Sequence, residues 1–577
     1  MVETEKANMD VKQANTSVKI MRSVLKLFVQ MSTPNYSMPW QMKRQQQSKG
    51  SGFVISNRRI LTNAHVVAYQ KSIHVRKHGD AKKYVAHVIH VAHQFDIAMV
   101  GVADEAFWED LEALQFGDIP ELEEDVVVVG FPTGGDNISV TRGVVSRVDI
   151  QRYSHSGTHL LAIQIDAAIN AGNSGGPALK DGKVVGIAFE TLDNAENIGY
   201  IIPSPVVNHF LTDIEKHNTF TGVCNLGIRW QPIESQHMRT YFKLSPKETG
   251  ILVSTTLKLS CSYDFLQRGD VLMSLNGVTI ADNGTVPFRG NERILWNYLI
   301  HSKFPNEKVQ AIICRAGEIK AVEICLTTLP FLVPPQLYDM RPSYVVYCGL
   351  VFVALSQPYM LHQYGKDWGR KGPIRLCDRI LYGVQEKKDQ EVVILSQVLA
   401  SELTAGYDGF ANIQLYRVNG IPILNLRHLC HVLDQLTLPH VNSCAIDVIA
   451  KPKSFSLSEN GSLTEPIELC QPIESLNGHE KDFNCIKSVE VEKNLNECIG
   501  GHKSRAYSEF TSESENFYHG IGDDPLLLDC TNFVHFELDK DKVVVFHIAS
   551  AYSKNSEILT QYAISSPRSN DLPEQVY

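Results

Sequence analysis

The chain has 577 residues, a formal net charge of −10, and 44% hydrophobic and 20% charged residues. This length predicts three or four domains, and the apolar content is sufficient for several buried cores. The acidic balance argues against a general nucleic-acid-binding protein, and no apolar run reaches the length of a membrane span.

The N-terminal segment is polar and acidic, and residues 1–17 are predicted to be disordered. It has neither the apolar core of a signal peptide nor the Arg-rich, acid-poor composition of a transit peptide. We therefore expect a protein of the nucleus or cytoplasm. An organelle is the alternative if the true start lies upstream of Met1.

Residues 18–203 contain many short β-rich runs, such as "DVVVVGFP" and "KVVGIAFE", separated by Gly, Pro, Asn and Asp. Short strands at this spacing predict a barrel or a sandwich. The amphipathic stretch Val18–Met31 is interpreted as the first strand or helix. Ser204–His217 begins with Ser-Pro and has apolar residues at helical spacing, which predicts a closing helix.

Two later segments resemble each other. The runs "CNLGIRW", "TGILVST" and "FLQRGDVLMSLNGVTI" correspond to "YCGLVFVAL", "EVVILSQVL" and "FANIQLYRVNGIPI". Each segment also has a helix candidate, "NERILWNYLIH" in the first and "NLRHLCHVLDQL" in the second. We interpret them as a duplicated β-rich module at 222–330 and 343–452.

Residues 453–524 are rich in Ser, Glu, Asn and Lys without periodicity, which predicts a disordered insertion. The runs "FVHFEL" and "VVVFHI" after it predict a hairpin, at 531–550, that completes the second module. A loose tail is expected at 553–577. Five residues of the polar region fit no common zinc spacing, so neither a metal nor a cofactor is expected; they are Cys470, His479, Cys485, Cys498 and His502.

The stretch "NAGNSGGPAL" places Ser174 between Gly172 and the pair Gly175 and Gly176. Glycines permit a tight loop whose N–H groups point into one space, which is the arrangement that holds an oxyanion. The alternative interpretation is a glycine-rich hairpin turn. A serine nucleophile also needs a base and an orienting group, so the rest of the chain must supply them.

Two motifs supply those groups. "TNAHVV" puts His65 after an apolar strand, and "HQFDIAMV" puts Asp96 at the head of another. A neutral imidazole takes the serine proton, and a carboxylate on its other nitrogen fixes the tautomer. Any one of the 21 histidines is more often a surface or core residue. The order His, Asp, Ser in one β-rich region makes coincidence a poor explanation.

The motifs "TNAHVV", "DIAMV", "NAGNSGGPAL" and "IGYIIP" resemble the trypsin-like protease domain of the HtrA/Deg (Do-like) serine proteases, which is followed by PDZ domains. The resemblance covers about 18 to 450 and resumes near 531, and "FPTGGDNISVTRGVVSRV" is most similar to the plant Do-like 9 group. It implies a mainly β chain, with a trypsin-like double β-barrel over 18–218 and two PDZ-like α+β modules.

The resemblance implies that Ser174 is the nucleophile, His65 the base and Asp96 the orienting group. It implies an oxyanion hole formed by the N–H groups of Gly172 and Ser174, with Asn173 between them. The substrate pocket is implied to lie between two segments, represented by Ala168, Ile169 and Asn170 and by Ile198, Gly199, Tyr200 and Ile201. The family usually has a small residue in place of Ile201, so a narrowed or reshaped pocket is expected here.

Asn225, Leu226, Gly227 and Ile228 resemble the loop of HtrA-type PDZ domains that receives a peptide's C-terminal carboxylate. A strand edge with free N–H groups accepts an added peptide strand. The alternative is that this stretch is only the first strand of its module. In the second module "CGLV" (Cys348–Val351) is a poorer match, and a structural or assembly role is expected.

These motifs are compatible with three functions. The first is an ATP-independent serine endopeptidase that cuts unfolded or damaged proteins, binds peptide C-termini and assembles as a trimer or as a hexamer built from trimers; no P-loop motif is present. The second is a proteolytically weak PDZ scaffold or holdase, which Ile201 favours and the complete triad opposes. The third is an esterase or acyl transferase. Gly172 and Gly176 fit its Gly-x-Ser-x-Gly spacing, but the order His, Asp, Ser and the lack of parallel α/β units oppose it.

Overall fold

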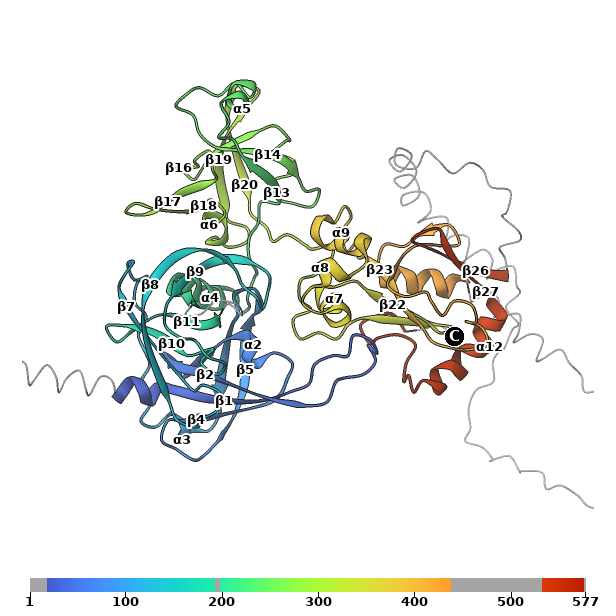
Figure 1. Cartoon of the computed structure of the whole chain (residues 1–577), viewed down its shortest axis with the longest axis horizontal. Helices are drawn as coiled ribbons and strands as arrows, with labels where there is room; N and C mark the ends of the chain where they lie inside the picture. Colours follow the sequence, from blue (N-terminus) through green and yellow to red (C-terminus); the bar gives the residue numbers. More distant parts are fainter. Residues whose placement is uncertain (1–17, 192–197, 437–531, 575–577) are drawn as a thin grey trace, which may run out of the picture. The chain divides into compact units, whose positions relative to one another are not determined.

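The computed structural model describes residues 18–191, 198–436 and 532–574. These residues form two closed β-barrels followed by two larger open sheets and a separate two-stranded hairpin (Figure 1). The barrel alternative predicted for residues 18–203 is therefore confirmed. The expected disordered segments, 1–17 and 453–524, lie outside the described residues.

The first barrel is built from the N-terminal strands. A helical turn at residues 18–23 leads directly into its first strand. The strand order is β1-β2-β3-β6-β5-β4. Strands β1 and β2 contribute long stretches of buried, mostly apolar positions, so they are covered on both faces. The bounds are β1 Val24–Met31, β2 Gln46–Ile55, β3 Arg59–Thr62, β4 Gln70–Lys77, β5 Tyr84–Ala92 and β6 Ile97–Val102.

The second barrel has the order β10-β11-β12-β9-β8-β7. Its β-branched runs, such as Val126–Val129, suit a pleated and half-buried surface. Helix α4, Ser204–His217, follows the last strand, so the predicted closing helix is confirmed. The bounds are β7 Asp125–Gly130, β8 Ser139–Arg152, β9 His159–Ile165, β10 Pro177–Lys180, β11 Lys183–Thr191 and β12 Gly199–Pro203.

The two barrels share one apolar cluster. Phe53 and Leu61 of the first barrel pack in it with Phe131 and Ile187 of the second. Lys26 of the first barrel also links the two barrels. Its buried ammonium donates to the carbonyl of Gly135 at 2.6 Å and to the Asp136 carboxylate at 2.8 Å, both in the β7–β8 loop of the second barrel. The packing fixes the loops of one barrel against the strands of the other.

The first module, residues 222–330, has the strand order β13-β14-β15-β19-β20, with β16 added to β15. Its helices are short. The bounds are α5 Gln236–Tyr241, α6 Tyr298–His301, β13 Ile228–Pro232, β14 Ile251–Thr256, β15 Val271–Leu275, β16 Val278–Thr279, β17 Thr285–Arg289, β18 Glu292–Leu295, β19 Lys308–Arg315 and β20 Glu318–Cys325.

The helix predicted over "NERILWNYLIH" is wrong in its first half. Residues Glu292–Leu295 form strand β18, which pairs with β17 as a separate hairpin. Ile294 lies opposite Val286, and both side chains are buried. Burial of this cross-strand pair outweighs the helical spacing of the apolar residues.

The second module consists of residues 343–436 and 532–574. Its main sheet has the order β21-β22-β23-β24-β26-β27, with β25 on β24. Residues 426–436 are helical, as predicted for "NLRHLCHVLDQL". The bounds are β21 Tyr344–Tyr347, β22 Leu350–Ala354, α7 Gln357–Tyr364, α8 Trp368–Lys371, α9 Ile374–Tyr382, β23 Val393–Val398, β24 Ile413–Val418, β25 Ile421–Pro422, β26 Phe533–Leu538, β27 Lys542–His547 and α12 Ile548–Gln561.

The tail expected to be loose from Ser553 is instead packed onto the second module through residue 574. Helix α12 covers the start of this segment and buries Ala551 and Ile558. Beyond the helix, Arg568 forms a buried ion pair with Asp434. The sequence does not predict this structure, because the segment has few apolar residues and is stabilised by contacts with residues that are distant in the chain.

Candidate active site

His65 and Asp96 lie side by side in the first barrel. His65 belongs to the short helix α2, Ala64–Val67, directly after β3. Asp96 follows the 3-10 turn η1, His93–Phe95, and has a left-handed backbone with φ of 54°. Because β3 and β6 are neighbouring strands, with Thr62 opposite Ala98, these two segments meet at one end of the barrel.

Two hydrogen bonds hold His65 to the Asp96 carboxylate. The imidazole Nδ1 donates to Oδ2 at 2.7 Å, and the backbone N–H of His65 donates to Oδ1 at 2.9 Å. Asp96 is only 1% exposed, whereas the His65 side chain is 34% exposed. Asn63 donates to the backbone carbonyl of Asp96 at 2.9 Å. The carboxylate is therefore fixed in place, while the imidazole remains partly exposed.

Ser174 lies in the loop between β9 and β10, and this loop is seated on the strand that leads to His65. Gly175 has φ of 86°, and a Cβ there would be 2.1 Å from the Ser51 carbonyl oxygen and 2.4 Å from Thr62 Oγ1. Such closeness is available only to glycine. Because Thr62 precedes His65 by three residues, the loop brings Ser174 into the same region as the histidine.

Several N–H groups of the Ser174 loop are bonded within the protein. Asn173 N–H donates to the carbonyl of Asn170, and Gly176 N–H donates to that of Asn173, each at 2.9 Å. Within 18–191, 198–436 and 532–574, the N–H groups of Gly172 and Ser174 have no acceptor. The Ser174 hydroxyl makes a long contact of 3.4 Å to the Phe189 carbonyl.

The two segments expected to line the substrate pocket are close together. The buried side chain of Ile169 lies against Gly199, since a Cβ on that glycine would be 2.8 Å from Ile169 Cδ1. Ala168 and Asn170 are exposed, whereas Tyr200 is buried. The remaining expected residue of β12, Ile201, is fully buried and packs in the core of the second barrel together with Ile169; Ile198 is half-buried.

A further histidine, His155, lies beside His65 and contacts a third, His93; no motif in the sequence points to either. The His155 ring lies 6.2 Å from the His65 ring, and His155 Nε2 is 3.0 Å from His93 Nδ1. Burial lowers the pKa of His155 to about 4, so this imidazole is neutral near pH 7. His155 lies in the β8–β9 turn and therefore approaches the site only through folding.

Residues Asn225–Ile228 form the approach to β13, an edge strand of the first module. Gly227 has φ of 65°, and its N–H donates to the side-chain oxygen of Asn225 at 2.7 Å. The Gly227 carbonyl accepts from Leu257 N–H at 2.9 Å, and Leu226 is buried. The strand has the open edge that peptide addition requires, while Asn225 occupies one N–H group of the loop.

In the second module, Cys348 and Gly349 form the turn between β21 and β22, with φ of 50° and 87°. The Cys348 N–H donates to the side-chain oxygen of Asn555, in α12, at 2.9 Å. The Gly349 carbonyl accepts from Leu399 N–H at 2.7 Å. The segment corresponding to the first module's loop is therefore covered by the module's own helix.

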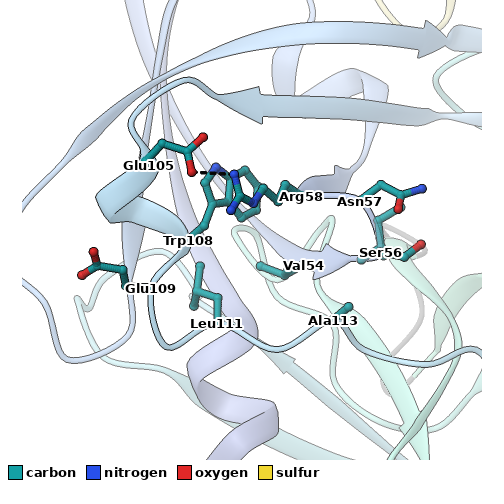
Figure 2. Close-up of a pocket in the computed structure, with 10 residues that line it drawn as sticks. Val54, Ser56, Asn57, Arg58, Glu105, Trp108, Glu109, Leu111 and Ala113 are labelled. Carbon is teal, nitrogen blue, oxygen red and sulfur yellow. Dashed lines mark hydrogen bonds and ion pairs between the residues drawn. The ribbon is translucent and has the colours of Figure 1, made fainter.

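A separate hollow of about 470 Å³ lies on the first barrel and contains none of the expected site residues (Figure 2). Arg58 forms an ion pair with Glu105 at this hollow. The described part of the chain holds no group of three His, Cys, Asp or Glu residues arranged for a metal. It also has no helix long and apolar enough to cross a membrane.

Comparisons with known proteins agree with this architecture. The family model described as a trypsin-like peptidase domain matches residues 50–187, and the one described as a PDZ domain matches residues 333–571. The chain is 42% identical over 412 residues to Protease Do-like 4, mitochondrial, of Arabidopsis thaliana, covering 71% of this chain and 76% of that protein.

Two further relatives come from the same plant. Putative protease Do-like 3, mitochondrial, is 41% identical over 434 residues, covering 75% of this chain and 76% of that protein. Protease Do-like 2, chloroplastic, is 42% identical over 417 residues, covering 72% of this chain and 68% of that protein. With its trypsin-like barrels and its PDZ domain, the chain is a serine endopeptidase that belongs to the Do-like (HtrA/Deg) protease family.

Proposed function

We propose that the chain hydrolyses peptide bonds of unfolded or damaged proteins without ATP, with Ser174 as nucleophile, His65 as general base and Asp96 as the orienting carboxylate. The observation that carries this proposal is the pairing of His65 with the buried Asp96 through two hydrogen bonds of 2.7 and 2.9 Å. This pairing keeps the proton on Nδ1 and leaves Nε2 to accept one.

In the proposed reaction the Ser174 hydroxyl attacks the scissile carbonyl while His65 Nε2 takes its proton. The hydroxyl's 3.4 Å contact with the Phe189 carbonyl is long, so little is lost when it turns toward the imidazole. The imidazolium then returns the proton to the leaving amine, and Asp96 stabilises its charge in the meantime. Water releases the acyl group by the same steps.

The oxyanion hole is proposed to consist of the N–H groups of Gly172 and Ser174, on either side of Asn173. Both N–H groups lack an acceptor in the described chain, and the Asn173 N–H is already bonded to Asn170. Preformed donors stabilise the negative charge that develops on the carbonyl oxygen, because they need no reorganisation during the reaction.

The primary specificity pocket is proposed between Ala168–Asn170 and Ile198–Ile201. Ile169 fills the space beside Gly199, and Ile201 packs behind it in the barrel core. Two bulky aliphatic residues at this position favour a small or medium aliphatic side chain in the substrate.

Peptide capture is proposed for the first module at Asn225–Ile228, where β13 offers an open strand edge. Because the Asn225 side chain accepts the Gly227 N–H, a peptide carboxylate must displace this side chain to bind there. For the second module we propose a structural or assembly role, supported by the contact of α12 with Cys348. Assembly as a trimer, or as a hexamer built from two trimers, is part of the same proposal.

The names of relatives place those proteins in mitochondria or chloroplasts. An organelle is therefore a candidate compartment for this chain beside the nucleus and cytoplasm. Imaging of a fluorescent fusion of the full-length protein decides among them.

The test is casein degradation by the wild-type protein and by Ser174→Ala. Ser139→Ala, which removes a hydroxyl from β8 of the same barrel, is the matched control. We expect Ser174→Ala to lose activity by several orders of magnitude and the control to keep it. Fluorophosphonate labelling should disappear in parallel. Cleavage by purified Ser174→Ala near the wild-type rate would refute the proposal, and a wild type that is neither active nor labelled would favour the scaffold or holdase alternative.

A further inference from the structure

Ser51 lies in the middle of β2 and is fully buried. Its N–H donates to the carbonyl of Ser174 at 2.9 Å, and its carbonyl accepts from the Thr62 hydroxyl at 2.7 Å. Its own hydroxyl donates to the Gly172 carbonyl at 2.6 Å and accepts from Phe131 N–H at 2.8 Å. All four hydrogen-bonding functions of this residue are therefore engaged around the Ser174 loop.

Four consecutive carbonyls of that loop have fixed donors. The Ala171 carbonyl accepts from Thr133 N–H at 2.6 Å, and the Asn173 carbonyl accepts from Gly176 N–H at 2.9 Å. The carbonyls of residues 172 and 174 are both held by Ser51. Because a peptide unit is planar and trans, fixing its carbonyl also fixes the direction of the N–H in the same unit.

Of these four carbonyls, that of Gly172 would disturb the oxyanion hole most if its peptide unit could rotate. Gly172 has φ of 99° and no side chain to restrict rotation of the peptide unit that follows it. If that unit rotated, its oxygen could turn toward the space where negative charge develops, and the donors on either side would no longer converge. The Ser51 hydroxyl opposes this rotation directly.

A hydroxyl suits this position for two reasons. It donates to one backbone group and accepts from another. Alanine can do neither, so a Ser51→Ala exchange would leave two buried backbone groups unpaired. The hydroxyl also fits the space, because Gly130 beside it has no side chain; a Cβ there would lie 2.8 Å from Ser51 Oγ.

We propose that Ser51 is a positioning residue for the oxyanion hole: by holding the Gly172 carbonyl away from the hole, it keeps the N–H groups of Gly172 and Ser174 pointing into the same space. The inference rests on the proposed role of Ser174 and its neighbouring N–H groups. Ser51 does not touch the substrate, so its contribution belongs to turnover and not to substrate affinity.

The test compares Ser51→Ala with Ser23→Ala in the full-length protein. Ser23 is also fully buried in the first barrel, and its hydroxyl donates to a backbone carbonyl, that of Glu112, at the same 2.6 Å. Removing an oxyanion donor costs about 10²–10³ in kcat, so misplacing the donors in Ser51→Ala should cost about 10- to 100-fold. KM for a peptide substrate should stay within about threefold.

A peptide boronate adds a readout that a merely structural role would not change. Its tetrahedral adduct occupies the oxyanion hole, so its affinity for Ser51→Ala should fall by the same factor as kcat/KM. Ser23→Ala should lower the melting temperature while kcat and boronate affinity stay near the wild-type values. Ser51→Cys keeps a weak donor in a similar volume and should give a kcat between those of wild type and Ser51→Ala; it also serves if Ser51→Ala does not fold.

The proposal is overturned if kcat of Ser51→Ala, or of Ser51→Cys in its place, equals that of Ser23→Ala, or if only KM rises. An inactive Ser174→Ala together with a fully active Ser51→Ala refutes the role of Ser51 alone. An active Ser174→Ala instead refutes the proposed nucleophile, so the two failures are distinguishable.

Discussion

Replacing Asp96 with Asn gives a sharp test of the proposed charge arrangement, because the structure dictates how the new amide must sit. The backbone N–H of His65 donates to Oδ1 at 2.9 Å, so the amide oxygen has to take that place. The NH₂ group then faces His65 Nδ1 from the Oδ2 position, 2.7 Å away. Since the NH₂ group donates, Nδ1 must accept, and the imidazole proton moves to Nε2.

An imidazole protonated on Nε2 cannot take the proton of Ser174. The expected loss in kcat for Asp96→Asn is about 10⁴-fold, which corresponds to about 5 kcal/mol of transition-state stabilisation. Initial rates on a fluorogenic peptide, with the active-site concentration determined separately, measure this loss. Asp96 is 1% exposed, so the amide stays in place and the folded structure should be retained.

Asp213 provides a matched control for this exchange. It is fully buried, accepts from His217 Nδ1 at 2.8 Å through Oδ1, and accepts from Thr221 N–H at 2.6 Å through Oδ2. Asp213→Asn therefore repeats the chemistry of the exchange away from the proposed site, and its kcat should stay within about twofold of the wild type. A loss below tenfold in Asp96→Asn, or an equal loss in both variants, would show that another group orients His65.

Three further predictions concern the loop, the pocket and the histidines. Gly175→Ala, with a Cβ 2.1 Å from a carbonyl oxygen of β2, should cost about 2–4 kcal/mol in the free energy of unfolding and abolish casein cleavage. Mass-spectrometric mapping of cleavage sites should show mostly Ala, Val, Ser, Thr or Leu before the cut, because Ile169 and Ile201 restrict the pocket; a majority of Phe, Tyr, Lys or Arg would contradict this. Burial lowers the pKa of His155 and His301 to about 4 from the ordinary 6.5, so below pH 6.5 the unfolded chain binds protons that the folded chain does not. The free energy of unfolding should therefore fall as the pH drops from 6.5 to 4, by up to about 3 kcal/mol per histidine, which melting curves across this range measure.

Two controls separate the causes in these experiments. Gly79 also has a positive φ, 79°, but open space around it, so Gly79→Ala reports backbone strain without a clash. If Gly79→Ala destabilises the protein as much as Gly175→Ala does, the close approach of the Ser174 loop is not what matters. Variants with His301→Gln or His155→Gln should lose part of the pH dependence; an unchanged slope would mean that other groups cause it.

Short β-rich runs predicted a barrel or a sandwich, and the residues around His65, Asp96 and Ser174 form recognisable motifs, because both are local signals in the sequence. The sequence could not identify Ser51 as a partner of the Ser174 loop. Nothing near this serine in the chain shows that its hydroxyl lies 2.6 Å from the Gly172 carbonyl, which is 121 residues away. Contacts of this kind exist only after the two barrels pack together.

Two errors of the prediction have the same physical origin. The segment around Ile294 has apolar residues that suit a helix or a hairpin, and pairing with Val286 decides between them. Helix α12 has a low apolar content and looks unstructured in isolation. The helix and the segment after it are held by partners that are distant in the sequence: Asn555 of the helix accepts from the Cys348 N–H, and Arg568 beyond it pairs with Asp434.

The order of strands in the second module has a consequence for how the protein is made. Strand β24 ends at Val418, while its neighbour β26 begins at Phe533, and Val418 pairs with Phe536. During translation β24 leaves the ribosome long before β26 is synthesised, so the edge of β24 that pairs with β26 stays unpaired during that time. An unpaired edge invites pairing with other chains. The barrels are complete far earlier, so a nascent chain would present a finished catalytic domain joined to an unfinished sheet, and chaperone demand should concentrate in that interval of synthesis.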